Sequence, residues 1–231
     1  MPANRTDWAL AISKGTLGGI PFVGPLAAEV IGVLIPNQRL DRLERLLQKL
    51  EAQVGDLDKG AVQRRFQVPA FVDLLEDGFV QAARALSDER LGYIAALVAN
   101  GLSSDEVEYL HLKMMLSILG NLNDAEVLFL VMHGRLSSNE QAAFMEKHRD
   151  VLYPKLVTMG SSDEEQEAGL VQDSFKSHLV QLGLLRPAFK SPRRGELPEF
   201  DDKTGMMKAS GYKLTPLGRM LLKYIDQPAD W

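Results

Sequence analysis

The chain has 231 residues, of which 45% are hydrophobic and 25% are charged, a composition typical of a folded protein with a sizeable apolar core. It contains no cysteine, which excludes disulfides, thiol catalysis and cysteine-zinc sites and is consistent with a reducing compartment. The net charge of -5 argues against a protein that coats nucleic acid over its whole surface, but it leaves room for a local basic patch.

An apolar segment at 15–36 contains a single charged residue, Glu29. It is long enough to raise the question of a membrane span, but Pro21 and Pro25 interrupt it and several glycines weaken it as one helix. We therefore expect two short helices, at about 8–17 and 25–34, joined by a tight apolar turn at 20–25, and we call them the N-terminal hairpin.

The N-terminal hairpin is apolar on all sides, so it is either buried among other helices or meets a membrane or a partner protein. Burial is the simpler interpretation. In the other interpretation the hairpin inserts conditionally into a membrane, and the basic residues that follow it face anionic headgroups. The candidate membrane- or partner-binding residues are Ile20, Phe22, Val23, Leu26, Arg39, Arg42 and Arg45.

Leucines from Leu40 to Val54 recur at helical spacing opposite charged residues, which predicts an amphipathic helix. Three more helices are predicted from proline or serine start signals and glycine stop signals. They start at Pro69, Ser87 and Ser104, and the last two end at Gly101 and Gly120. The inward residues expected in the first are Phe71, Leu74, Leu75, Phe79 and Ala82, and the apolar residues of the third are Val107, Leu110, Met114, Leu116 and Leu119. Residues 1–120 are therefore predicted to form an N-terminal helical bundle.

After Asn121 the predicted order is three helices, a strand, a long polar loop, a second strand and a final helix. The two strands are predicted at 184–186 and 212–214, and Thr215 caps the final helix. This order is typical of a winged helix with one added helix. The predicted fold class is therefore mostly α, with a winged-helix-like unit and a small β-hairpin at 121–231.

The sequence contains no phosphate-binding loop, no His-Glu-x-x-His motif and no Gly-x-Ser-x-Gly motif. Glu108 and His111 have the Glu-x-x-His spacing of an iron ligand pair, but a di-iron site needs a second such motif and two further glutamates, and no second motif occurs. We therefore predict no catalytic residue, no metal site, no cofactor and no enzymatic activity.

The segment from Arg186 to Lys223 carries nine basic and four acidic residues, so it is positively charged within an acidic chain. A winged helix can contact phosphates with such residues. The candidate nucleic-acid-binding residues are Lys176, Lys190, Arg193 and Arg194. The helix in the recognition position starts with the acidic run 163–165, however, which opposes groove reading. Protein contact is therefore favoured, and DNA binding is the alternative.

Several segments of the chain resemble known bacterial proteins. Gly-Gly-Ile-Pro-Phe-Val-Gly-Pro-Leu-Ala at 18–27 and Ile-Pro-Asn-Gln-Arg at 35–39, with the charged leucine helix after them, resemble the opening of uncharacterised bacterial proteins. The middle from Phe71 to Gly101 and the end, Leu-Gly-Leu-Leu at 182–185 followed by Tyr-Lys-Leu-Thr-Pro-Leu-Gly at 212–218, resemble the Abi-alpha family of bacterial abortive-infection proteins. The resemblance implies a helical protein with a winged-helix-like end that takes part in phage defence, and it carries over no catalytic residue.

The sequence therefore predicts a non-enzymatic bacterial interaction or effector protein in phage defence, whose N-terminal hairpin binds a membrane or a partner. The alternative function is a DNA-binding regulator that uses the C-terminal unit. We expect a protein partner or a homo-oligomer, with a membrane surface and DNA as further alternatives and with no small-molecule substrate. The expected location is the cytoplasm, with peripheral attachment to the inner membrane as the alternative.

Overall fold

A computed structural model describes most of the chain after residue 39. The described residues are 40–54, 64–65, 67–103, 106–135, 138–153, 158, 160–191, 197–200, 205, 207–227 and 229. Helices make up most of them, and one two-stranded antiparallel sheet is present. The prediction of a mostly helical protein with a small β-hairpin is therefore confirmed. The predicted N-terminal hairpin lies outside the described residues.

The described chain divides into two compact units. Unit 1 comprises the described residues up to Asn121 together with Tyr224–Asp226. Unit 2 comprises the other described residues from Leu122 onwards. Each unit is described by itself below.

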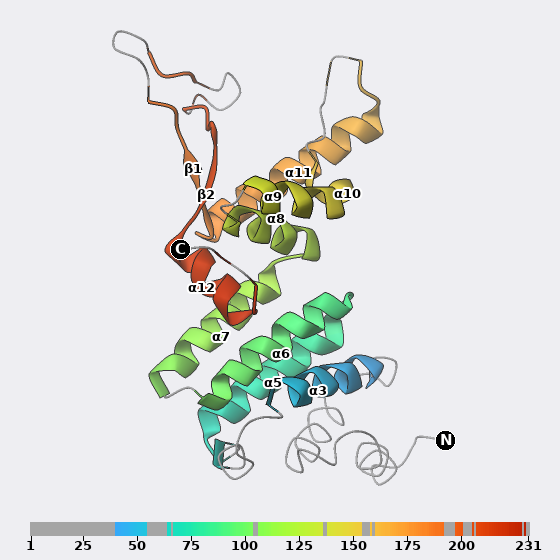
Figure 1. Cartoon of the computed structure of the whole chain (residues 1–231), viewed down its shortest axis with the longest axis vertical. Coiled ribbons are helices and arrows are strands. Elements are labelled where there is room, and N and C mark those ends of the chain that lie inside the picture. Colours follow the sequence, from blue (N-terminus) through green and yellow to red (C-terminus); the bar gives the residue numbers. More distant parts are fainter. Residues whose placement is uncertain are drawn as a thin grey trace. The chain divides into compact units, whose positions relative to one another are not determined.

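Unit 1 is built from four described helices (Figure 1). The side chains buried among them are apolar. The helices are α3 (Leu40–Val54), α5 (Pro69–Arg84), α6 (Asp88–Ser103) and α7 (Glu106–Asn121). Helix α3 packs against α5 and α6, while α5, α6 and α7 pack against one another. As the helical spacing predicts, α3 buries the stripe Leu43, Leu46, Leu47, Leu50 and Val54.

Helix α6 continues through Asn100 and Gly101, where the sequence predicts that it ends. The glycine instead allows close packing, because a Cβ atom at position 101 would lie 2.7 Å from Leu74 Cδ2. Asn100 Nδ2 donates to the Ala96 carbonyl oxygen, at 2.9 Å, and so stays compatible with the helix. The predicted helix end is wrong because a glycine that follows an asparagine marks a close helix crossing here, not a stop.

Helix α7 buries only part of the apolar set that the sequence predicts, because Leu116 and Leu119 are buried as expected but two other members are not. Leu110 and Met114 are 72% and 41% exposed. The side chains that α7 buries are Tyr109, Leu112, Met115, Leu116 and Leu119. The assignment of Leu110 and Met114 to the apolar face is therefore wrong. The helix is apolar on most sides, so spacing alone does not identify the packed side.

Unit 2 contains five described helices and the β-hairpin. They are α8 (Asp124–Gly134), α9 (Ser138–Lys147), α10 (Arg149–Leu152), α11 (Asp163–Gln181), β1 (Leu185–Ala188), β2 (Gly211–Leu214) and α12 (Pro216–Tyr224), whose last residue counts with unit 1. Helix α8 packs against α9, α10, α11 and β2, and α11 packs against β1. The four-residue helix α10 is not anticipated by the sequence patterns.

The element ends in unit 2 follow from local hydrogen bonds. Asn123 and Ser162 each form a capping box at the start of α8 and α11, with the N3 glutamates Glu126 and Glu165. Gly183, which the sequence predicts to end this helix, follows the C-cap of α11 and has the left-handed φ of +71°. These caps fix where α8 and α11 begin and therefore which of their faces meet.

Within the described residues no single helix is both long and apolar enough to cross a membrane. Among the described residues, the successive helical stretches Tyr109–Asn121 and Asp124–Gly134 reach that length and apolarity only when they are counted together.

Candidate interaction surface

The β1–β2 hairpin continues beyond its two regular strands. Leu185 pairs with Leu214 and Ala188 pairs with Gly211 in the antiparallel register. Farther along, Phe200 and Met207 form an isolated antiparallel bridge, and the Lys208 amide donates to the Glu199 carbonyl oxygen at 2.8 Å. We call the described residues 185–191, 197–200, 205 and 207–214 the hairpin arm. Figure 1 shows β1 and β2 leaving the helices side by side.

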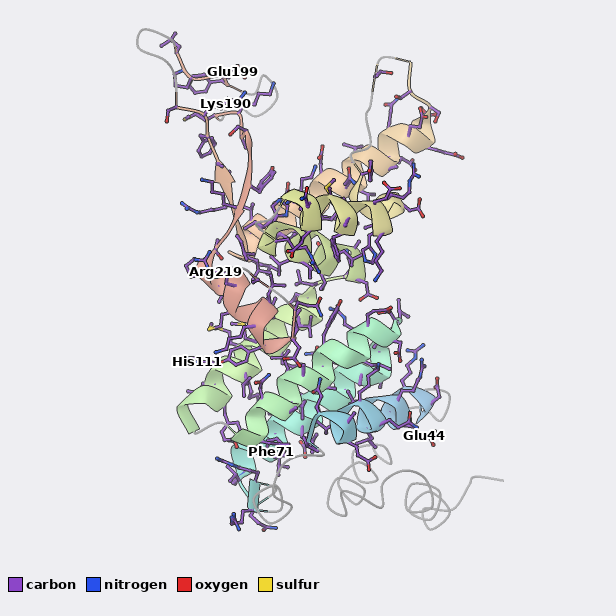
Figure 2. All side chains as sticks on the ribbon, viewed as in Figure 1. Glu44, Phe71, His111, Lys190, Glu199 and Arg219 are labelled. Carbon is purple, nitrogen blue, oxygen red and sulfur yellow. The ribbon has the colours of Figure 1, made fainter. Side chains whose placement is uncertain are left out.

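Two cations lie opposite each other on the exposed face of the hairpin arm. Arg186 on β1 pairs with Lys213 on β2, so their side chains point to the same side of the sheet. Both residues are exposed, and neither forms a salt bridge within the described part of the chain. Lys190 and Glu199 lie farther out on the same arm (Figure 2). Like charges directly opposite each other destabilise a strand pair unless an anion lies close to both.

The hairpin arm also exposes apolar side chains. Their exposed fractions lie between 38% and 87%. They are Phe189, Leu197, Phe200 and Met207. A single exposed apolar side chain is ordinary, but four on one narrow hairpin exceed what solubility alone favours. The arm therefore combines unpaired cations with apolar contact groups.

Helix α11 is attached to α8 by both apolar and polar contacts. The Phe175 and Phe129 rings pack at a centroid distance of 6.1 Å. His178 Nδ1 donates to Oε1 of the buried Glu126, at 2.7 Å. Because Glu126 also belongs to the α8 capping box, this bond ties α11 to the start of α8.

A second polar contact holds the middle of α11. The buried Gln172 donates through Nε2 to the carbonyl oxygens of Val151 and Tyr153, at 2.9 and 2.8 Å. Both carbonyls belong to the end of α10 and the residue after it. Hydrogen bonds are directional, so Gln172 fixes the rotation of α11 about its own axis.

The rotation of α11 leaves a mixed acidic and apolar stripe outward. Leu170 and Val171 are 70% and 52% exposed, and Glu167, one turn before them, is exposed as well. Asp163 and Glu164 continue the stripe to the helix start. We call Asp163, Glu164, Glu167, Leu170 and Val171 the α11 stripe. Leu170 is predicted from the sequence to continue the helix and is found on its outer side.

His133 lies where α8 meets β2. Its Nδ1 donates to the Phe129 carbonyl oxygen at 2.7 Å, and its ring contacts the Tyr212 ring edge-on, at 6.4 Å. Burial lowers the pKa of His133, the hydrogen bond to Phe129 opposes this shift, and the positive charge of Lys176 adds to it. The folded chain therefore favours neutral His133.

Several predicted site residues are outside the described part of the chain. These are Ile20, Phe22, Val23, Leu26, Arg39, Arg193 and Arg194. Arg42 donates through Nη1 to the Ala83 carbonyl oxygen at 3.0 Å. Arg45 bonds Asp41 within α3 at 2.9 Å and lies 3.8 Å from Asp88. The membrane or partner role of these residues stays a prediction.

Two candidates for nucleic-acid binding, Lys176 and Lys190, lie in the described part of the chain. They belong to different elements. Lys176 lies 3.1 Å from Asp173 on the same helix and is only partly exposed. Lys190 is exposed on the hairpin arm. The structure instead brings Arg186 and Lys213 together. The sequence predicts the two strands but not their register, so it does not identify this pair.

No group of three or more His, Asp or Glu side chains that could hold a metal ion occurs among the described residues. The chain matches no protein-family model, no curated protein and no solved structure in the comparisons made with each. The Abi-alpha resemblance therefore stays a prediction from the middle and the end of the sequence.

Proposed function

We propose that this chain is a non-enzymatic interaction or effector protein, and that its unit 2 is a winged-helix-like module used for protein contact. In this proposal α8, α9 with α10, and α11 are the three helices of the module, and the hairpin arm is its wing. The helices of unit 1 are the helical bundle that carries it. The single observation that carries the proposal is the α11 stripe, which presents Leu170 and Val171 next to acidic side chains.

The α11 stripe favours a protein partner over nucleic acid. In a DNA-reading winged helix the third helix enters the major groove between two rows of phosphates. Asp163, Glu164 and Glu167 would be repelled there. A protein surface, by contrast, can cover Leu170 and Val171 and supply cations to the acidic side chains.

Photo-crosslinking tests the proposed contact surface. A photoreactive phenylalanine at position 171 or 200 should yield crosslinked protein adducts in bacteria that express the chain. The matched control is position 86, because Leu86 is 89% exposed but lies outside the α11 stripe and the hairpin arm. Adducts identified by mass spectrometry at 171 and 200 but not at 86 are expected. Equal labelling at all three positions, or none, would show that this surface makes no specific contact.

Phage defence is proposed on the family resemblance alone. Cells that express the chain should show a lower efficiency of plating for at least one phage than cells with an inactive insert. Replacing Leu170 and Val171 by serine should restore plating, while Leu86→Ser should not. Unchanged plating across a broad phage panel would remove this part of the proposal.

The membrane part of the proposal concerns the predicted N-terminal hairpin. Full-length protein should float with anionic vesicles, and Phe22→Asp with Val23→Asp should abolish flotation, because an apolar hairpin partitions into the interface and a carboxylate opposes it. A full-length protein that stays in the dense fraction with anionic vesicles would contradict the membrane role and leave partner binding as the use of this segment.

DNA-binding regulation is the second candidate, and the opposed cations Arg186 and Lys213 favour it. Replacing Arg193 and Arg194 by alanine should weaken binding to duplex DNA and flatten its salt dependence, since each lost phosphate contact lowers the slope by about one. The measurement is fluorescence anisotropy across a salt series. Absence of binding at low salt would eliminate this candidate.

A further inference from the structure

Unit 2 carries two surfaces of opposite charge that the described chain leaves uncovered. The hairpin arm presents the opposed cations Arg186 and Lys213. The α11 stripe presents Glu164 and Glu167. None of these four side chains forms a salt bridge within the described residues. Apolar side chains adjoin both surfaces, so each is suited to a partner that is both charged and apolar.

The opposed cations call for an anion from outside the described chain. Arg186 and Lys213 are direct cross-strand partners, and two like charges in that position repel each other. An arginine and a lysine in one register position would both be satisfied by carboxylates placed between them. The surface is therefore suited to an anionic partner.

The α11 stripe is not explained by helix stability alone. The helix dipole accounts for acidic residues in the first turn, and the capping box accounts for Glu165. Neither accounts for Glu167, which lies beyond the first turn, nor for the exposed pair Leu170 and Val171. These three residues are adjacent on one side of the helix.

One copy of the chain does not bring these surfaces together. Helix α11 has 19 residues and is therefore about 28 Å long. Its C-terminal end adjoins β1, so its acidic start lies at the far end of the helix from the base of the hairpin arm. Figure 1 shows the start of α11 and the hairpin diverging within unit 2.

We propose that a second copy of this chain covers both surfaces, with the α11 stripe of each copy packed on the hairpin arm of the other. This inference rests on the proposed interaction function and names its partner. In such a two-fold pair the same contact forms twice, because the α11 stripe of each copy meets the hairpin arm of the other. Carboxylates of Glu164 and Glu167 meet Arg186 and Lys213, and Leu170 and Val171 meet the apolar side chains of the arm.

The dimensions of the two surfaces are comparable. From Glu164 to Val171 the helix rises about 10 Å, and from Arg186 to Lys190 an extended chain spans about 13 Å. Nucleic acid or an anionic membrane would satisfy the arm alone and would repel the α11 stripe. Only a partner that is basic where α11 is acidic and acidic where the arm is basic covers both, and the chain itself meets that condition.

Charge reversal with mixing tests this proposal on the full-length chain. One variant carries Glu164→Lys with Glu167→Lys, positions outside the capping box, and the other carries Arg186→Glu with Lys213→Glu. Sedimentation velocity should give a dissociation constant for the dimer at least about tenfold higher for each variant than for the natural chain, because each places like charges at both contacts. The control variant, Glu140→Lys with Asp150→Lys, raises the net charge as much as the Glu164→Lys, Glu167→Lys variant does, at exposed positions of α9 and α10, and should dimerise normally.

Mixing the two variants gives the decisive result. The lysine-bearing α11 of one then faces the glutamate-bearing arm of the other, and the unchanged α11 faces the unchanged arm, so both contacts regain opposite charges. An equimolar mixture should recover dimerisation to within about threefold of the natural chain, which also shows that both variants are folded. A natural chain that stays monomeric up to about 100 μM, or variants that fail to recover on mixing, would overturn the proposal.

The failure of self-association and the failure of the interaction function give different results. Crosslinks from position 171 to another protein, with a monomeric natural chain, would overturn self-association and keep the proposed function. Loss of DNA binding in the Arg186→Glu, Lys213→Glu variant without any change in association would assign the hairpin arm to nucleic acid instead.

Discussion

The two units of this protein differ in what holds their interiors together. The described interior of unit 1 is lined by apolar side chains, and its helices approach closely at Gly78 and Gly101. Unit 2 buries two polar side chains, Glu126 and Gln172, and each makes hydrogen bonds to another element. Apolar contacts supply stability without fixing direction, whereas buried hydrogen bonds are directional and costly to misplace.

This difference indicates that the buried hydrogen bonds of unit 2 fix the orientation of α11. Glu126 and Gln172 hold this helix at two points, so the residues of the α11 stripe are forced outward. In unit 1, Gln81 donates to the Leu116 carbonyl oxygen and Arg42 donates to the Ala83 carbonyl oxygen of another helix, but both side chains are only partly buried. The comparison predicts that unit 1 responds most to lost volume, and that unit 2 responds most to lost hydrogen bonds and to backbone crowding.

The largest effect is expected in the apolar interior of unit 1. Leu74 of α5 is fully buried and faces Gly101 of α6. Leu74→Ala should lower the free energy of unfolding by about 3.5 kcal/mol, because contacts are lost and a cavity remains. Urea unfolding followed by circular dichroism measures the loss. Hydrogen exchange should rise in α5, α6 and α7 while α8 and α11 stay protected.

Leu110→Ala is the matched control for Leu74→Ala, because Leu110 is largely exposed on α7 and should change stability by less than about 0.5 kcal/mol. Equal losses for the two leucines would contradict the packing of unit 1 described here.

The next effect is expected at Gly218 in α12. A Cβ atom there would lie 2.4 Å from the Leu184 carbonyl oxygen, which is backbone and cannot rotate away. Gly218→Ala should therefore destabilise unit 2 by about 3 kcal/mol. Gly92→Ala in α6 is the control, since nothing lies within 4 Å of its Cβ position and alanine should stabilise that helix by about 0.5–1 kcal/mol. Similar signs for the two variants in urea unfolding would contradict the crowding at Gly218.

A smaller loss is expected when the buried capping box is broken. Glu126→Ala removes a cap and leaves His178 without its carboxylate partner, which should cost about 2 kcal/mol. Glu165 occupies the same position in the exposed capping box of α11 and has no such partner, so Glu165→Ala should cost about 0.5–1 kcal/mol. If the two losses in urea unfolding are equal, the Glu126–His178 bond contributes nothing beyond the cap.

The apolar periodicity of the sequence predicts unit 1 well because burial there follows helical spacing. The stripe of α3 and the buried residues Phe71, Leu74, Leu75 and Phe79 of α5 are all placed correctly. The end of α6 is not, because Gly101 meets Leu74 across a close crossing that only the tertiary structure contains. Spacing also fails in α7, where apolar residues occur on most sides and do not identify the packed face.

In unit 2 local signals predict the starts of α8, α11 and α12, since a cap depends on residues three positions apart. They do not predict that His178 bonds Glu126, 52 residues away, or that Gln172 holds the end of α10. The outward position of Leu170 follows from those long-range bonds. The sequence therefore identifies the charged residues of the candidate surface. It does not predict that they lie together on the outer side of α11.

The smallest expected effect is a pH dependence that belongs to unit 2. Burial lowers the pKa of His133 in the folded chain, while in the unfolded chain the imidazole titrates near its ordinary pKa of about 6.5. Below that pH the unfolded chain binds more protons than the folded chain, so stability is full above about pH 6.5 and falls as the pH decreases. The urea midpoint of the natural chain should therefore drop between about pH 7.5 and about pH 5.5.

His133→Gln isolates this contribution, because glutamine does not titrate and the other histidines remain in both proteins. The decrease in the urea midpoint should be smaller in the variant, and hydrogen exchange at acidic pH should differ between the two proteins in α8 and β2 rather than in α3 or α5. Identical pH slopes would mean that His133 is solvated when folded. A larger slope in the variant would mean that Lys176 and burial are outweighed by the hydrogen bond to Phe129, which is the contact that favours the charged ring.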